Sequence, residues 1–145
     1  MTASKRNETI EKAINESRHL NVLIVDLKKD ADLLQLQIQK LKHTATILES
    51  YKDAFKEITN TYFDLIIVDI DLPQGNGIDF IKQIRELRGS VNVVTITKDS
   101  CRELEKETRE QRVIYYAIKP FEVAELKAIL NHILVKKIKL QIVSK

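Results

Sequence analysis

Four short apolar runs constrain the fold more than any other feature of the sequence. They are residues 21–26 (NVLIVD), 65–69 (LIIVD), 91–96 (VNVVTI) and 113–118 (VIYYAI), and residues 44–48 (TATIL) form a weaker fifth candidate. The runs are rich in β-branched or aromatic residues, as strands are when both faces of their sheet are covered. We therefore interpret them as buried strands.

Helical patterns lie between these runs, with apolar residues spaced to fall on one face of each helix. The stripes comprise Ala31, Leu34, Ile38 and Leu41; Ala54, Phe55, Ile58 and Tyr62; Ile78, Ile81 and Ile84; and Leu126, Leu130, Ile133 and Leu134. Alternation of buried strands with helices is typical of βαβ units, which form a parallel sheet with right-handed crossovers. The pattern predicts an α/β fold with helices on both faces of the sheet.

The two ends of the chain fit this pattern less well. Residues 2–19 have a thin apolar face and predict an extra N-terminal helix, which either packs on the domain or pairs with another chain in a homodimer. Residues 138–142 alternate like a strand, but they equally suit a longer last helix or a frayed end. We divide the chain into an N-terminal helical extension at 1–20, a central domain at 21–135 and a basic extension at 136–145.

Length and composition exclude several classes of protein. A chain of 145 residues suits a single domain, and 43% hydrophobic with 31% charged residues is typical of a globular protein. No apolar run reaches the roughly 18 residues of a membrane span, and the polar N-terminus has no secretory signal. The single cysteine, Cys101, excludes an internal disulfide. We therefore expect a cytoplasmic protein.

The net charge of +3 comes from one end of the chain. Residues 136–145 carry four lysines and no acid, which leaves 20 basic and 21 acidic side chains elsewhere. A dedicated nucleic-acid binder presents a basic face, and this near-neutral body argues against that class. We interpret the lysines as a solubilising terminus.

Polar side chains of complementary type occur where the strong strands end. These residues are Asp26, Asp69, Thr95 and, just past the last strand, Lys119. Ligands bind at the carboxyl ends of strands in an open parallel sheet. A carboxylate can attack a phosphoryl donor, and the developing charge then needs an oxygen-bound divalent cation, a lysine and a hydroxyl donor. The set therefore predicts a site for phosphoryl chemistry.

These motifs resemble the receiver domain of two-component response regulators, including the chemotaxis-type single-domain regulators. The matching segments are LIVD at 23–26, FDLIIVDIDLPQGNG at 63–77, VVTIT at 93–97 and YAIKPF at 116–121. The resemblance covers about residues 21–135. It implies a flavodoxin-like receiver fold, in which five parallel strands have the order 2-1-3-4-5 with helices on both faces.

The resemblance also implies roles for individual residues and for partners. Asp69 corresponds to the phosphoacceptor, Asp26 to a magnesium-binding acid, Asp71 to a further metal ligand through its main-chain carbonyl, Thr95 and Tyr116 to the switch pair, and Lys119 to the lysine that meets the phosphoryl group. A sensor histidine kinase or phosphotransfer protein would be the donor. A downstream protein would bind a surface formed by the last two helices and the last strand, so the chain would be a signalling switch and not a dedicated enzyme. From the residues alone, Tyr116 fits the core equally well.

Two departures from the family pattern bear on the chemistry. Leu27 stands where a second acid usually follows Asp26, which predicts weak Mg²⁺ binding unless the Asp71 side chain compensates. Ile96 stands where a small residue usually follows the switch threonine, and a larger side chain would hinder donors. One alternative is therefore a phosphorylation-independent pseudo-receiver. A more distant one is a haloacid-dehalogenase-type phosphatase, because Asp69 and Asp71 also match its DxD signature.

Overall fold

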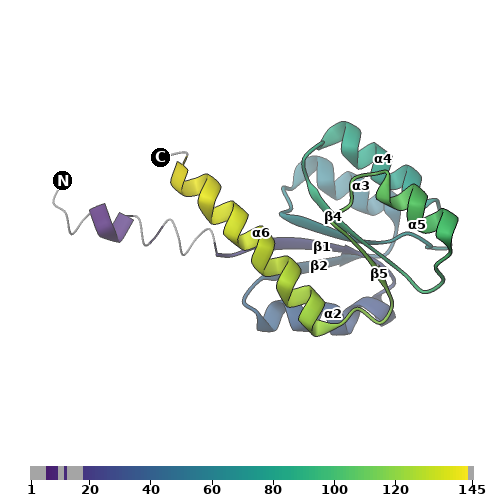
Figure 1. Cartoon of the computed structure of the whole chain (residues 1–145), viewed down its shortest axis with the longest axis horizontal. Helices are drawn as coiled ribbons and strands as arrows, with labels where there is room; N and C mark the ends of the chain where they lie inside the picture. The colour runs from purple at the N-terminus through teal and green to yellow at the C-terminus, as the bar shows by residue number, and fades with distance from the viewer. Residues whose placement is uncertain (1–5, 10–11, 13–17, 144–145) are drawn as a thin grey trace.

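The computed structural model describes residues 6–9, 12 and 18–143, and it contains a five-stranded parallel sheet in the order β2-β1-β3-β4-β5 (Figure 1). The strands are β1 (Asn21–Val25), β2 (Thr44–Leu48), β3 (Leu65–Asp69), β4 (Asn92–Thr97) and β5 (Tyr115–Ile118). All the apolar runs, including the weaker one at 44–48, form strands. The predicted strand order is confirmed, and every neighbouring pair is parallel.

Helices cover both faces of the sheet. They are α2 (Lys28–Lys40), α3 (Tyr51–Asn60), α4 (Gly77–Leu87), α5 (Arg102–Arg109) and α6 (Val123–Val143). α2 and α6 pack on one face through Leu34 and Leu130. α3 and α4 pack on the other through Ile58 and Ile81, and Leu104 of α5 contacts that same face. The central strands β1, β3 and β4 are buried between these two layers because both of their faces are apolar, whereas the edge strands β2 and β5 are partly exposed.

The structure corrects the predicted apolar stripe of α3. Tyr62 is not part of the α3 stripe: the helix ends at Asn60, and Tyr62 is 69% exposed. Tyr51 replaces it as the additional buried position of α3. The stripe ends before Tyr62 because the backbone becomes extended at Thr61, directly after α3.

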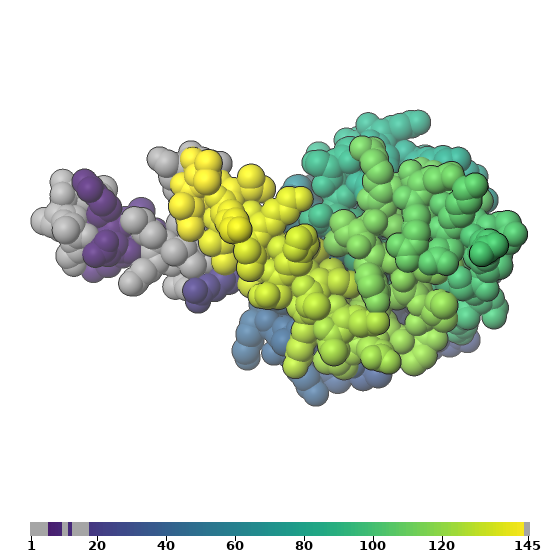
Figure 2. Space-filling model, viewed as in Figure 1, coloured from purple at the N-terminus to yellow at the C-terminus, as the bar shows by residue number. Residues whose placement is uncertain are grey.

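The last helix runs without a break to Val143, so the alternating residues 138–142 are helical. Only Leu126, Leu130 and Ile133 of α6 are buried. Figure 2 shows the C-terminal half of the helix extending away from the body of the domain. Of the predicted N-terminal helix, residues 6–9 and 12 are helical, and the remainder falls largely outside the described residues. In the described part of the chain, no helix is both long enough and apolar enough to cross a membrane.

Candidate functional site

The carboxyl edge of the sheet brings together side chains from three strand ends. Asp69 is the last residue of β3, Asp26 directly follows β1, and Lys119 directly follows β5. The backbone N–H of Lys119 donates to the carbonyl of Thr97 at 2.8 Å, which holds the lysine beside β4. The predicted convergence of these residues at one edge is therefore present.

A single ammonium group holds the two buried carboxylates. Nζ of Lys119 lies 2.6 Å from Oδ2 of Asp69 and 2.9 Å from Oδ2 of Asp26. Asp26 is 1% exposed and Asp69 is 6% exposed. Burial raises the pKa of Asp26, although the bond from Lys119 opposes that shift. Burial alone would lower the pKa of Lys119, but its bonds to Asp69 and Asp26 raise it, so the ammonium stays charged.

A third carboxylate at the site, Asp30, was missed in the sequence. It lies in the first turn of α2, with Oδ2 3.4 Å from Nζ of Lys119 and 3.3 Å from Nζ of Lys98. Burial would raise the pKa of Asp30, but Lys98 and Lys119 together lower it. Its signal in the sequence is weak, because an acid in the first turn of a helix is common and complements the helix dipole.

The loop after Asp69 turns back over the Asp69 carboxylate. The N–H of Asp71 donates to Oδ1 of Asp69 at 2.7 Å, while the Asp71 side chain is exposed. Within residues 6–9, 12 and 18–143, no three His, Cys, Asp or Glu side chains are grouped to hold a metal ion. The carboxylates of Asp26 and Asp69 are oxygen donors at this edge of the kind that a hard cation prefers.

Tyr51 is a second residue that sequence reasoning missed. Its hydroxyl donates to the main-chain carbonyl of Asp69 at 2.6 Å and accepts from the N–H of Leu72 at 3.2 Å. Burial raises the pKa of Tyr51, so the hydroxyl stays protonated across the ordinary pH range. An aromatic residue at the start of a helix predicts only packing, so nothing in the sequence indicated this bond.

The proposed switch residues, Thr95 and Tyr116, are neighbours across β4 and β5 and are both buried. Thr95 pairs in register with Val68, the residue before Asp69. Among the described residues, its Oγ1 is the buried side-chain polar atom without a hydrogen-bond partner. The hydroxyl of Tyr116 lies 2.6 Å from Oγ of Ser100, and Arg109 lies over its ring. Tyr116 is thus buried yet hydrogen-bonded near α5.

Leu27 and Ile96 occupy different environments. Leu27 is the N-terminal cap of α2, makes no capping bond with its side chain and is partly buried. Ile96 is 2% exposed and belongs to the core under α2 and α6. Its bulk is therefore accommodated by core packing.

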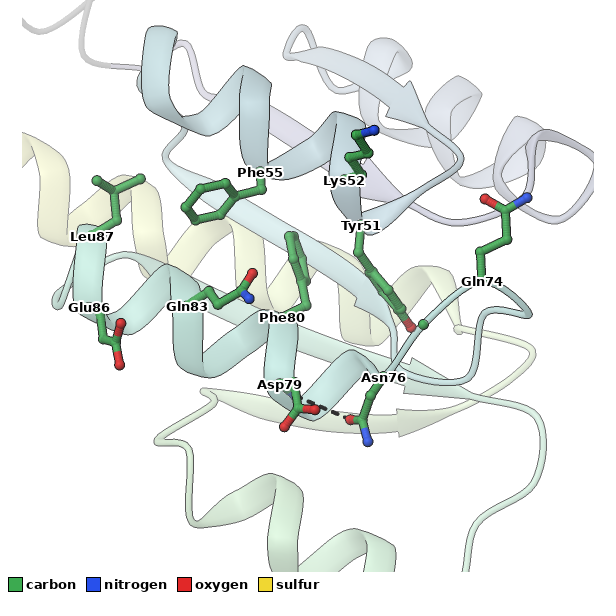
Figure 3. A pocket seen from close by; sticks show the side chains of 11 residues that line it. Tyr51, Lys52, Phe55, Gln74, Asn76, Asp79, Phe80, Gln83, Glu86 and Leu87 are labelled. Carbon is green, nitrogen blue, oxygen red and sulfur yellow. Dashed lines mark hydrogen bonds between the residues drawn. The ribbon is translucent and has the colours of Figure 1, made fainter.

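A hollow of about 750 Å³ lies between α3 and α4 (Figure 3), and neither Asp26 nor Asp69 is among the residues that line it. Tyr51, Phe55 and Phe80 supply its aromatic wall. We place the chemistry at the strand ends, because the paired charges are there and not in the hollow.

Comparisons with known proteins agree with this geometry. The family model of the response regulator receiver domain matches residues 22–131. A curated relative, a probable C4-dicarboxylate response regulator named DctR from Halalkalibacterium halodurans, is 39% identical over 68 residues, which are 47% of this chain and 30% of that protein. Aligned segments make up 26% of one curated relative and 52% of another. The chain thus spans about half or less of these relatives.

Solved structures share the fold. A CheY-like receiver domain protein from Methanospirillum hungatei has a TM-score of 0.77 at 21% identity, over 83% of this chain and 97% of that one. The receiver domain of the sensor histidine kinase PA1611 from Pseudomonas aeruginosa has a TM-score of 0.72 at 21% identity, over 80% of this chain and 98% of that one. That structure has a magnesium ion coordinated in its active-site cleft.

The parallel sheet in this order, with acids and a lysine at its carboxyl edge, is the arrangement of a receiver-type signalling module. The chain belongs to the response regulator receiver domain family of two-component systems.

Proposed function

We propose that this receiver accepts a phosphoryl group on the carboxylate of Asp69. The observation that carries the proposal is the 2.6 Å contact between Nζ of Lys119 and Oδ2 of Asp69 at a strand end that is almost completely buried. A lysine held beside a buried carboxylate is already in place to stabilise the negative charge that develops on a phosphoryl group during transfer. The donor is a histidine kinase or a phosphotransfer protein.

In the transfer, an oxygen of Asp69 attacks phosphorus and forms the acyl phosphate bond. The bond from phosphorus to the imidazole nitrogen of a donor phosphohistidine breaks, and the electron pair and a proton stay with the imidazole. Lys119 then pairs with a phosphoryl oxygen. The hydroxyl of Thr95, which has no partner in the described structure, donates to another oxygen and so gains a buried hydrogen bond.

The donor set also fits a magnesium ion. Asp26 and Asp69 would hold it through carboxylates and Asp71 through its main-chain carbonyl. A bound Mg²⁺ supplies neutralisation of phosphoryl charge. Without the ion, Lys119 supplies part of this neutralisation, because its ammonium already pairs with Asp26 and Asp69. With Leu27 in place of an acid, we expect weak binding.

The output of the switch is a protein contact on the face formed by α5, β5 and α6. Ile114, Ile118 and Val123 are exposed on these elements or the turns beside them, by 42%, 56% and 40%. Tyr116 connects this face to the site through its register pairing with Thr95 and its bond to Ser100. A downstream protein that recognises the phosphorylated form would bind there.

The acceptor is tested by incubation with a small acyl phosphate and Mg²⁺, followed by mass measurement of the intact protein. We expect one added phosphoryl group in the wild type and in Asp79→Asn, and none in Asp69→Asn. Asp79→Asn is the matched control because it changes an exposed acid of α4 that has no assigned role at the site. Label in Asp69→Asn would overturn the assignment. A wild type that stays unlabelled by both the small donor and cognate kinases would identify a pseudo-receiver.

The label should also decay without another protein, because water can attack the acyl phosphate in the same site. The phosphatase alternative has no support from the family match, and it makes an opposite prediction. Steady turnover of an aryl phosphate by the wild type, lost in Asp69→Asn, would favour the phosphatase over the receiver.

A further inference from the structure

The hydroxyl of Tyr51 holds together the turn at residues 69–72, which carries Asp69. It bridges the carbonyl of Asp69 and the N–H of Leu72, so both ends of the 69–72 turn are tied to α3. We propose that Tyr51 is a positioning residue for phosphoryl transfer, and this inference rests on the proposed role of Asp69. The tie holds the backbone from which the Asp69 carboxylate and the Asp71 carbonyl both project.

The ring of Tyr51 is itself held in place. It is 9% exposed and stacks on Phe80 of α4, with ring centroids 5.0 Å apart and planes inclined by 26°. Figure 3 shows the two rings side by side between α3 and α4. Because the ring is already fixed, little side-chain entropy is lost when its hydroxyl forms hydrogen bonds. The hydroxyl therefore holds its two backbone partners at a defined position.

Gly75 makes room for this arrangement. A β-carbon added at Gly75 would lie 2.9 Å from Cδ2 of Tyr51, closer than real contacts of that kind. The ring therefore lies against the loop at both ends, through its hydroxyl near residues 69–72 and through its edge at Gly75. A side chain at position 75 would displace the ring while leaving the hydroxyl on it.

The acceptor geometry depends on this tie because the N–H of Asp71, within the turn, donates to Oδ1 of Asp69. If the turn relaxes, the carboxylate loses its fixed direction relative to Lys119 and to an incoming phosphorus. Misplacement of a reacting group by about 1 Å can slow a reaction up to about 100-fold.

The test compares Tyr51→Phe with Ile58→Val in the full chain. Tyr51→Phe keeps the stacked ring and removes only the hydroxyl. Ile58→Val removes one methyl group from a buried position of the same helix, and it serves as a control for a small loss of stability. Two quantities are measured: the rate of phosphoryl uptake from a small acyl phosphate, and the hydrogen-exchange rate of the Leu72 amide.

We expect Tyr51→Phe to slow uptake by about tenfold and to speed Leu72 exchange by a similar factor. Ile58→Val should change neither rate beyond what its melting temperature explains. Gly75→Ala, which keeps the hydroxyl but displaces the ring, should slow uptake as Tyr51→Phe does.

Equal uptake in Tyr51→Phe and wild type would overturn the inference, as would equal slowing in Tyr51→Phe and Ile58→Val. A wild type that takes up no phosphoryl group would count against the proposed function instead. In that case the Leu72 amide still decides whether Tyr51 restrains the loop, and unchanged exchange in Tyr51→Phe would overturn the inference.

Discussion

Nζ of Lys119 lies 2.9 Å from Oδ2 of Asp26, a carboxylate that is 1% exposed. The charge of Asp26 is tolerated in this position because the ammonium, which is itself only 13% exposed, provides its counter-ion. The pair therefore contributes to the fold as well as to the site. Removing either partner would leave the other as a buried charge without a counter-ion.

We expect Lys119→Ala to lower the free energy of unfolding by about 3 kcal/mol at neutral pH, because it leaves buried carboxylates without a cation. In an Asp26→Asn background, the same substitution should cost at least about 1 kcal/mol less, since one of those charges is gone. Urea unfolding of the four proteins measures the coupling. Lys28→Ala, which breaks an exposed pair with Asp32, is the control and should cost less than about 0.5 kcal/mol. Equal costs of Lys119→Ala in both backgrounds would show that Asp26 and Lys119 are not coupled.

Leu27→Asp should strengthen magnesium binding by about tenfold, or 1.4 kcal/mol, because it adds an oxygen ligand beside Asp26. It also gives α2 the side-chain cap that Leu27 lacks, which offsets part of the repulsion between carboxylates. Titration of Mg²⁺ followed by chemical shifts at the strand ends measures the affinity. Leu33→Asp makes the same change at an exposed position of α2 and should have no effect. If the wild type already binds Mg²⁺ as tightly as Leu27→Asp, another group fills the missing position.

Gly77→Ala should lower the free energy of unfolding by about 2 kcal/mol through overpacking. Gly77 begins α4 against the backbone of Ile70, and an added β-carbon would lie 2.6 Å from the Ile70 carbonyl oxygen. Backbone atoms cannot yield as a flexible side chain does. Gly89→Ala is the matched control, because its nearest neighbour would lie at 3.5 Å, an ordinary contact. Similar denaturation midpoints for the two variants would contradict the close approach.

Stability should fall as the pH is lowered from 7.5 to 5.5, and His43 should account for part of that loss. Burial, reinforced by the charge of His19, lowers the pKa of His43 from 6.5, and its Nδ1 accepts the Leu20 N–H at 3.0 Å. The unfolded chain therefore binds a proton near pH 6.5 that the folded chain binds only at lower pH, which favours unfolding as the pH falls. His43→Asn should flatten the profile of melting temperature against pH, whereas His132→Asn, at an exposed position, should not. A His43→Asn profile parallel to the wild type would rule out this group as the cause.

Much of the architecture followed from local pattern. The apolar runs were long enough and apolar enough to predict five strands, and the residues at their ends met because parallel strands share a carboxyl edge. Tyr62 was placed wrongly because helical spacing continued in the sequence beyond the point where the backbone of Thr61 becomes extended.

The parts of the site that were missed depend on tertiary packing. Asp30 reaches Lys119 because α2 begins just past the carboxyl end of β1 and packs on the sheet through Ala31 and Leu34. Tyr51 reaches the Asp69 carbonyl only because its ring is stacked on Phe80, a residue 29 positions later on another helix. Spacing along one element carries no information about either contact.

Helix α6 begins four residues after Lys119 and is anchored by Leu126, Leu130 and Ile133. Lys137 ties the helix to the body once more, because its Nζ lies 3.2 Å from Oδ1 of Asp64. The part from Lys137 to Val143 extends roughly 9 Å beyond this ion pair at the helical rise per residue. A tilt of about 10° at Lys137 would displace Val143 by roughly 1.5 Å, so a rearrangement around Lys119 that tilts the helix would move its far end more than the side chains at its base.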